Sequence, residues 1–370
     1  MDRVVAEVEK NNTGLTALRQ KAEAQKLGIK TGIYLKNPEV GFNYLWGSPS
    51  LIGNRIDLSF DQTFDFPTAY RYKKDIAEGR NQQVDIDYQL SRLTLIQQVR
   101  QLCIDLAYTN SLQSEYTKRL EHAQSMVKSY QAKFDQGDAG ILDLNKARLN
   151  LLSISKEAES NTIGYQSLLA ELAGLNGGIP IQWSDGNYPS REIPVDFDQW
   201  YQKAESGNPM LTWLKKELEI SKQQEKLQSA LGLPKFSTGY LSEKIVGEHF
   251  QGVTLGMSLP LWENKNAVKQ AKAQSLAVQD IERDRKLMFY NRLKSIHAKA
   301  VSLQKSVTDY RSTLQTVDNG SFLGKALEAG EITLIDYILE LSLYYDSQTK
   351  LLTAERDLNR VVTELYQFLE

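Results

Sequence analysis

The sequence repeats one pattern twice. In each half, two short segments of alternating polarity come first, a proline ends them, and a long stretch without proline follows. No proline occurs between Pro67 and Pro180 in the first half, and none follows Pro260 in the second. Because proline interrupts helices and central strands, this distribution predicts two long helical regions, each preceded by a pair of strands.

The two halves can be aligned at points spread along their length. Pro38 corresponds to Pro234, Asp143 corresponds to Asp336, and the segments 134–137 and 327–330 both end in glycine. The spacing between corresponding positions is nearly constant. We therefore predict two similar repeats, residues 1–186 and 187–370, that form one elongated body rather than two or three unrelated domains.

Strict alternation identifies the strands. Over residues 55–66 one face is apolar and the other is polar. The apolar face carries Ile56, Leu58, Phe60, Phe64 and Phe66, and the polar face carries Arg55, Asp57, Ser59, Asp61, Thr63 and Asp65. We expect one β-pair in residues 38–66 and another in residues 234–260.

The long stretches without proline predict α-hairpins. In the first repeat we expect a hairpin over residues 68–175, and in the second over residues 264–368. Connecting helices are expected at residues 2–30 and 197–230. Helices of this length are not stabilised by local propensity alone, so the hairpins need lateral packing partners.

Closure of the sheet requires more than one chain. Four strands with one apolar face cannot close a barrel, and an open sheet would expose its edges and its apolar surface. Three chains would supply twelve strands, an even number typical of outer-membrane barrels. The predicted fold class is thus mainly α with a small β part: tandem-duplicated long α-hairpins that form an α-barrel, plus four strands per chain in a trimeric 12-stranded transmembrane β-barrel. The alternative is a soluble β-sandwich with a buried aromatic core.

Composition excludes several classes of function. The net charge of −2 and the pI of about 6.1 argue against a nucleic-acid partner. Cys103 is the only cysteine, and the three histidines have no second ligand one helical turn away, so neither a disulfide nor a metal site is expected. No nucleophile elbow or phosphate loop is present, so we expect no enzyme activity and no cofactor. The charged segment 1–7 has no apolar signal core, and we expect any signal peptide to be absent from this chain.

The organisation resembles the TolC-like outer membrane efflux protein family, the outer membrane factors of tripartite pumps. The resemblance covers essentially the whole chain and rests on the tandem halves, the strand-to-helix junction at 255–262, and the hairpin tips at 134–144 and 327–336. It implies a homotrimeric channel in the bacterial outer membrane, embedded in outer-membrane lipid, with helices extending into the periplasm. Such a channel conducts substrates passively, with a periplasmic adaptor and an inner-membrane transporter as partners.

The resemblance also implies a gate. Asp336 matches a gate-lining aspartate of the family, and three copies of it could form a carboxylate ring. A second acidic position, one turn further, is Leu339 here, with Glu340 beside it; a basic gating position is Ile332, so the closed-state latch of TolC is not expected. The alternative for Asp336 is a cap at the start of its helix.

Two further sets of residues are candidates. The tip turns at Gly137, Asp138, Gly330 and Glu331 would contact the adaptor. Asp57, Asp61 and Asp65 share the polar strand face and, if that face lines the pore, would give a mild cation preference. The alternative is that these carboxylates are solvated, with Arg55 as a partial counter-ion.

A different function also fits part of the pattern. A periplasmic coiled-coil adaptor or a structural scaffold protein would carry an α-hairpin too. Adaptors usually carry one hairpin flanked by soluble β-domains, so two hairpins with two matching β-pairs favour the channel.

Overall fold

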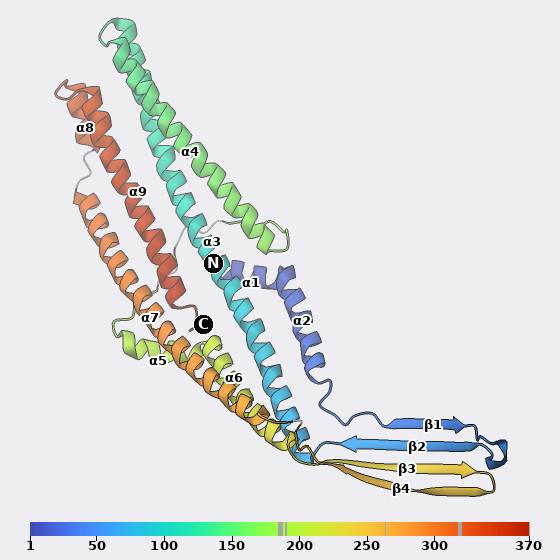
Figure 1. The fold of residues 1–370 in the computed structure, drawn as a ribbon. Helices are drawn as coiled ribbons and strands as arrows, with labels where there is room; N and C mark the ends of the chain where they lie inside the picture. Colours follow the sequence, from blue (N-terminus) through green and yellow to red (C-terminus); the bar gives the residue numbers. More distant parts are fainter. Residues whose placement is uncertain (184–187, 189–190, 263, 317–319, 370) are drawn as a thin grey trace. The chain divides into compact units, whose positions relative to one another are not determined.

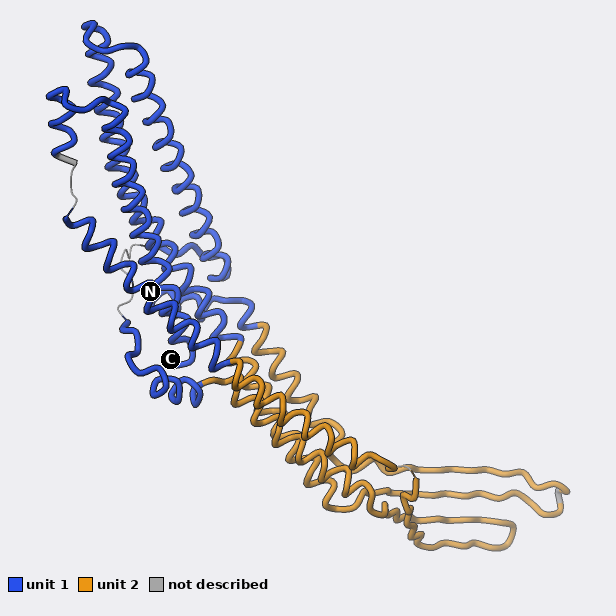
Figure 2. The backbone as a smooth tube through the Cα atoms, turned by 60° about the vertical axis from the view of Figure 1, so that its left-hand side comes forward, with its two compact units in different colours: residues 1–16, 91–207, 289–370 blue, residues 17–90, 208–288 orange. Residues whose placement is uncertain are grey.

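The computed structural model describes residues 1–183, 188, 191–262, 264–316 and 320–369 (Figure 1). The chain forms two compact units, which Figure 2 colours separately. We call residues 1–16, 91–207 and 289–370 the helical unit, and residues 17–90 and 208–288 the sheet unit. Each unit draws on both halves of the sequence, so the compact units do not follow the boundary between the two predicted repeats.

The helices and strands follow one another in the order that the sequence pattern predicts. Their bounds are α1 (Asp2–Asn11), α2 (Thr13–Ile29), β1 (Glu39–Leu45), the 3-10 turn η1 (Ser50–Ile52), β2 (Arg55–Phe64), α3 (Pro67–Gln136), α4 (Ile141–Leu175), α5 (Phe197–Gly207), α6 (Pro209–Leu231), β3 (Lys235–Ile245), β4 (Glu248–Ser258), α7 (Ala267–Thr316), α8 (Gly320–Glu328) and α9 (Leu334–Leu365). None of the described helices combines the length and the hydropathy that crossing a membrane requires.

The sheet unit contains one antiparallel sheet with the strand order β1-β2-β3-β4. The strands of the two halves meet at its centre, where β2 pairs with β3 and Phe60 lies opposite Tyr240. β3 and β4 lie within the predicted range 234–260 and meet at a tight turn at Gly247, whose φ of 82° suits glycine. The four predicted strands are therefore confirmed, and each pair lies within its predicted range.

One face of this sheet is apolar and exposed. The register places its large side chains together, and nothing in the described chain buries them. The set comprises Val40, Phe42, Tyr44, Ile56, Leu58, Phe60, Phe236, Tyr240, Val253, Leu255 and Met257. Val253 and Leu255 are 75% and 83% exposed. Burial of this apolar face would therefore require apolar surroundings outside the described chain.

Two of the predicted connecting helices are interrupted. The expected helix 2–30 is split into α1 and α2 at Asn12, whose side chain accepts from the Leu15 amide at 2.8 Å and starts a new helix. The expected helix 197–230 is split at Asn208, which caps α6 by accepting from the Met210 amide at 2.8 Å, with Pro209 in the first turn. Both corrections have the same cause: an asparagine cap competes with helix continuation.

The first arm of the predicted hairpin 264–368 corresponds to α7 and α8. Residues 317–319 between them lie outside the described part of the chain.

Lateral packing in the helical unit comes from several small cores rather than one. Val4 and Val8 of α1 pack with Val99 and Leu106 of α3 and with Leu172 of α4. Elsewhere an aromatic cluster of Phe197, Trp200, Tyr201, Phe289 and Tyr290 joins α5 to α7, and Leu365 of α9 contacts it. These contacts supply the sideways support that helices of this length require.

Candidate functional site

The two hairpin tips share one backbone device. At the first tip Gly137 has a φ of 83°, and the Asp138 amide donates to the Lys133 carbonyl at 2.8 Å. At the second tip Gly330 has a φ of 75°, and the Glu331 amide donates to the Ala326 carbonyl at 2.9 Å. Both arrangements are Schellman motifs, in which a left-handed glycine ends the helix. Gly137, Asp138, Gly330 and Glu331 are all exposed, as contact with another protein would require.

The helices that leave the tips begin differently. Thr333 forms a capping box with Asp336: the Thr333 hydroxyl donates to Asp336 Oδ2 at 2.5 Å, and the Asp336 amide donates to Thr333 Oγ1 at 3.3 Å. At the first tip Gly140 precedes α4 without a side-chain cap, and Asp143 instead pairs with Lys146 at 3.1 Å. Asp143 and Asp336 correspond in sequence but not in structural role.

The capping box fixes the charge of Asp336. The hydrogen bond from the Thr333 hydroxyl, and after it the bond from the Thr333 amide, hold the pKa of the Asp336 carboxyl below its usual range. The helix-capping alternative is therefore what the structure shows within one chain. The carboxylate remains exposed, so the cap leaves open the predicted role at a gate.

The two tips are packed together. Met126 and Tyr130 of α3, Leu144 and Ala147 of α4, and Leu334, Tyr337 and Leu341 of α9 form one apolar cluster. Ile332, at the position where the family carries a basic gating residue, is partly buried against this cluster. Leu339 is exposed, and Glu340 lines a groove between α7 and α9.

A buried arginine joins the first hairpin to the second. Arg119 of α3 is only 4% exposed, and its Nη2 donates to the Tyr345 carbonyl at 2.9 Å and to the Thr349 hydroxyl at 3.0 Å. Its guanidinium also lies 4.6 Å from the Tyr345 ring centre. We call Arg119, Tyr345 and Thr349 the α3–α9 clasp. His122 Nδ1 lies 3.1 Å from the Tyr345 hydroxyl, and burial raises the pKa of that phenol to about 12.

The clasp is unusual because Arg119 makes no ion pair within the described chain. Its Nε has no hydrogen-bond partner, and it lines a cavity of about 300 Å³ that also carries Glu157 and Asp346. A buried cation is costly unless nearby groups compensate its charge, and these two carboxylates are the acidic groups that line the same cavity. Sequence reasoning missed this residue. Its signal is an arginine within the apolar series Leu112, Tyr116, Ala123, Met126 and Tyr130 of α3.

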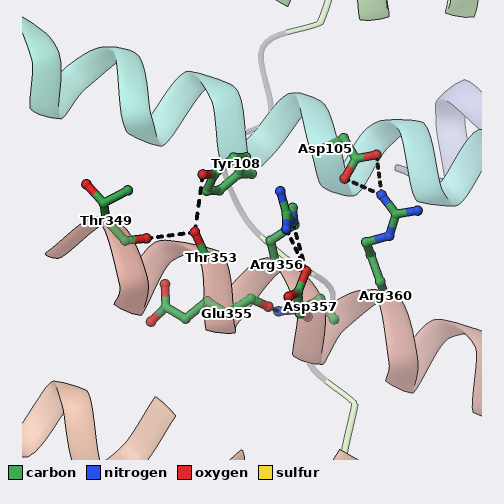
Figure 3. A network of polar contacts seen from close by, with 9 residues as sticks. Asp105, Tyr108, Thr349, Thr353, Glu355, Arg356, Asp357 and Arg360 are labelled. Atoms are coloured by element: carbon green, nitrogen blue, oxygen red, sulfur yellow. Dashed lines mark hydrogen bonds and ion pairs between the residues drawn. The ribbon is translucent and has the colours of Figure 1, made fainter. Parts of the chain in front are cut away.

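Polar contacts continue along α3 and α9 away from the tips (Figure 3). Arg360 donates to both carboxylate oxygens of Asp105, at 2.7 and 2.6 Å, and the Tyr108 hydroxyl lies 3.3 Å from Thr353 Oγ1. The Arg356 guanidinium lies 4.6 Å from the Tyr108 ring centre. The pairing of α3 with α9 is thus specified mainly by directional contacts, which fix the register between the hairpins.

The sheet unit holds the predicted acidic strand face. Asp57 accepts from Arg55 Nε at 2.7 Å, and the same Nε lies 3.0 Å from Glu243 on β3. Asp61 lies on the same face of β2. Asp65 follows β2, which ends at Phe64: its amide donates to the Tyr70 hydroxyl at 2.9 Å, and its carboxylate accepts from Lys73 at 2.7 Å. The structure therefore keeps two of the three predicted carboxylates on the polar face of β2, and the third lies beyond the end of the strand.

No group of histidine, cysteine, aspartate and glutamate side chains suited to a metal ion occurs among the described residues.

We expect Arg119→Lys to weaken the α3–α9 clasp. A lysine ammonium cannot bind the Tyr345 carbonyl and the Thr349 hydroxyl and also stack on the Tyr345 ring. One of these oxygens then loses its hydrogen bond, or the buried charge loses its contact with the ring. The expected loss of stability is about 1–3 kcal/mol, measured by thermal or urea unfolding in detergent. Arg148→Lys, at an exposed position of α4, is the matched control. Equal effects of the two substitutions would show that the clasp does not stabilise the fold.

We expect Thr333→Ala to reduce the acid sensitivity of α9. Because the folded-state pKa of Asp336 is lowered, its contribution to stability is present above the unfolded-state pKa and is lost as pH falls through the folded-state value. Without the Thr333 hydroxyl, the pH-dependent contribution of Asp336 to the free energy of unfolding becomes smaller. Unfolding measured between neutral pH and about pH 3 tests this. Thr333→Ser keeps the hydroxyl and should behave like the parent; an unchanged pH profile for Thr333→Ala would contradict the capping box.

Comparisons with known proteins agree with this geometry. Residues 48–178 match the family model described as outer membrane efflux protein. No curated protein matches the sequence significantly.

Solved structures match over nearly the whole chain. A membrane protein from Pseudomonas aeruginosa is similar with a TM-score of 0.85 at 14% identity, covering 100% of this chain and 89% of that one. The Campylobacter jejuni CmeC outer membrane channel gives 0.82 at 15%, covering 99% and 84%. The outer membrane protein VceC of Vibrio cholerae gives 0.82 at 13%, covering 100% and 95%. These structures confirm the predicted fold class, mainly helical with a four-stranded antiparallel sheet, and residues 48–178 of the chain are similar to the outer membrane efflux protein family.

Proposed function

We propose that three copies of the chain form the exit duct of a tripartite efflux pump, through which substrates pass from the periplasm to the exterior. The observation that carries this proposal is the exposed apolar face of the four-stranded sheet. Its edge strands β1 and β4 each have one neighbour within the chain. Twelve strands from three chains would pair every edge and place the apolar face against outer-membrane lipid.

The helical unit supports the periplasmic part of the duct. Its hairpins are amphipathic and end in exposed tips, where Gly137, Asp138, Gly330 and Glu331 would contact a periplasmic adaptor. In the proposed trimer the hairpins form an α-barrel. The chain itself supplies no energy, which fits a passive channel whose inner-membrane transporter drives export.

Asp336 is the proposed gate residue, with Glu340 as a second acidic position one turn away. The carboxylate of Asp336 is exposed, and its pKa is lowered by the Thr333 hydroxyl, so it stays ionised at neutral pH. Three ionised carboxylates around a three-fold axis would attract cations and repel anions at the narrow end of the duct.

The first test is the mass of the protein component after extraction in detergent. We expect about 126 kDa, three times the 42.0 kDa of one chain. We also expect aggregation when the detergent is removed, because the apolar sheet face then meets water. A stable monomer without detergent would contradict the channel and favour the adaptor or scaffold alternative.

A second prediction concerns the polar face of the sheet, which in the proposed barrel lines the pore. Replacing Asp57 and Asp61 together by asparagine should lower the cation-to-anion permeability ratio on the order of twofold in planar bilayers. The matched control is Asp65→Asn, since Asp65 follows the strand and Lys73 neutralises it. A double variant with the selectivity of the parent would show that these carboxylates do not face the conducting path.

A further inference from the structure

The cavity beside the α3–α9 clasp lies where three long helices of the helical unit meet. α3 contributes Tyr116 and Arg119 to its lining, α4 contributes Glu157, and α9 contributes Asp346 and Thr349. Its volume of about 300 Å³ is near the lower end of the range for small-molecule sites. All of its lining residues belong to the helical unit. We call it the three-helix cavity.

The guanidinium of Arg119 is a fixed positive charge in the wall of this cavity. The rings of Tyr116 and Tyr345 lie against it, with their centres 5.3 and 4.6 Å from its central carbon. Within the described chain its hydrogen bonds come from Nη2, and Nε has no acceptor. A buried guanidinium without a paired carboxylate is poorly compensated. Its planar fork of N–H donors matches the geometry of a carboxylate.

An unpaired carboxylate lines the same cavity from α4. Glu157 is exposed, and the Ser153 hydroxyl donates to its Oε1 at 3.4 Å. No cation of the described chain forms an ion pair with it. Burial and, after it, the charge of Glu157 raise the pKa of the Tyr116 phenol. The carboxylate is therefore close to the same tyrosine that lies against the guanidinium of Arg119.

The charges of the lining favour a ligand that carries both signs. Asp346, the other acidic residue of the lining, is already paired, because its Oδ2 lies 2.6 Å from Lys350 Nζ. Among the described lining residues Arg119 is the only basic one. The cavity thus offers one unpaired cation and one unpaired anion. A simple anion would be repelled by Glu157 and a simple cation by Arg119, whereas a zwitterion can pair with both.

The remaining lining includes an apolar wall. Ile154 of α4 and Leu341 of α9 are 9% and 6% exposed, and Ile338 of α9 is half-buried beside them in the lining. Such a wall suits an aliphatic group, whose burial is favourable in proportion to its area. A free α-amino acid with an aliphatic side chain carries all three features that the cavity matches: a carboxylate, an ammonium group and a hydrocarbon branch.

We propose that the three-helix cavity binds a small zwitterion, an α-amino acid with an aliphatic side chain. Its carboxylate pairs with Arg119, its ammonium group pairs with Glu157, and its side chain lies on the apolar wall. The bound molecule contacts α3, α4 and α9 at once, so binding stabilises the packing of these helices. The cavity is formed by one chain, so the site does not depend on the trimer put forward above.

Titration of the whole chain in detergent with L-leucine tests the site. We expect saturable binding by calorimetry and a Tm that rises with leucine concentration. Two analogues keep the shape of leucine and lack one charge each: isocaproate has no amino group, and isoamylamine has no carboxylate. Each should bind about tenfold more weakly or worse, because one charged hydrogen bond is lost. Glycine, which has both charges and no side chain, should also bind more weakly than leucine.

The variant Glu157→Gln isolates the contact with the ammonium group. Glu157 is exposed, so its replacement should leave the fold intact. We expect leucine to bind about tenfold more weakly to this variant. Isocaproate should bind to it at least as well as to the parent, because the carboxylate that repels it is gone. Glu159→Gln is the matched control: Glu159 is exposed on α4 but does not line the cavity, so leucine affinity should stay unchanged.

Three results would overturn the zwitterion site. The first is the absence of saturable leucine binding to the parent protein. The second is isocaproate binding to the parent as tightly as leucine, which indicates an anion site at Arg119 alone. The third is equal leucine affinity of Glu157→Gln and Glu159→Gln. None of these results changes the mass of the detergent-extracted protein, so failure of this proposal is distinguishable from failure of the proposed function.

Discussion

The exposed apolar face of a four-stranded sheet is the constraint on which the rest of the structure depends. Four strands are too few to curl into a closed cylinder, and both edge strands have free hydrogen-bonding groups. A chain that kept this sheet in water would aggregate. Apolar surroundings and further copies would remove both problems together, which is why the proposed function joins membrane insertion to assembly.

The helical unit meets a related constraint by different means. A helix as long as α3 needs sideways support along its whole length, yet a wide apolar face on every helix would collapse the unit into a solid bundle. The structure uses small, separated apolar clusters and places directional contacts between them, such as Asp105 with Arg360 and Arg119 with Thr349. Directional contacts hold the register of two long helices while burying little apolar area. Walls one helix thick are compatible with this design.

The sequence predicted those features of the fold and of the site whose signals lie within a few neighbouring residues. Alternation and the spacing of prolines located four strands and two hairpins, because both signals act over a few residues. The breaks at Asn12 and Asn208 also have local signals in the sequence, and Pro209 marks the second. The residues on either side of each asparagine favour helix, so the sequence pattern predicted one continuous helix at each place. The pairing of α3 with α9 and the burial of Arg119 could not be predicted, because the acceptors lie on a helix from the other half of the chain. Asp65 was expected on the strand, but the Tyr70 hydroxyl takes its amide out of the sheet.

Duplication explains why the two tips have the same backbone conformation but different side-chain contacts. The Schellman turns at Gly137 and Gly330 use the same pair of hydrogen bonds, since a reversal between two long helices tolerates few conformations. The first turns that follow are free to diverge: Asp143 pairs with Lys146, whereas Asp336 is tied to Thr333 and has no basic partner in the described chain. The Asp143 carboxylate is thus paired with a cation in its own turn, and the Asp336 carboxylate is not. In the ring of copies proposed above, Asp336 rather than Asp143 would therefore be the member of this corresponding pair whose charge responds to cations, salt and pH.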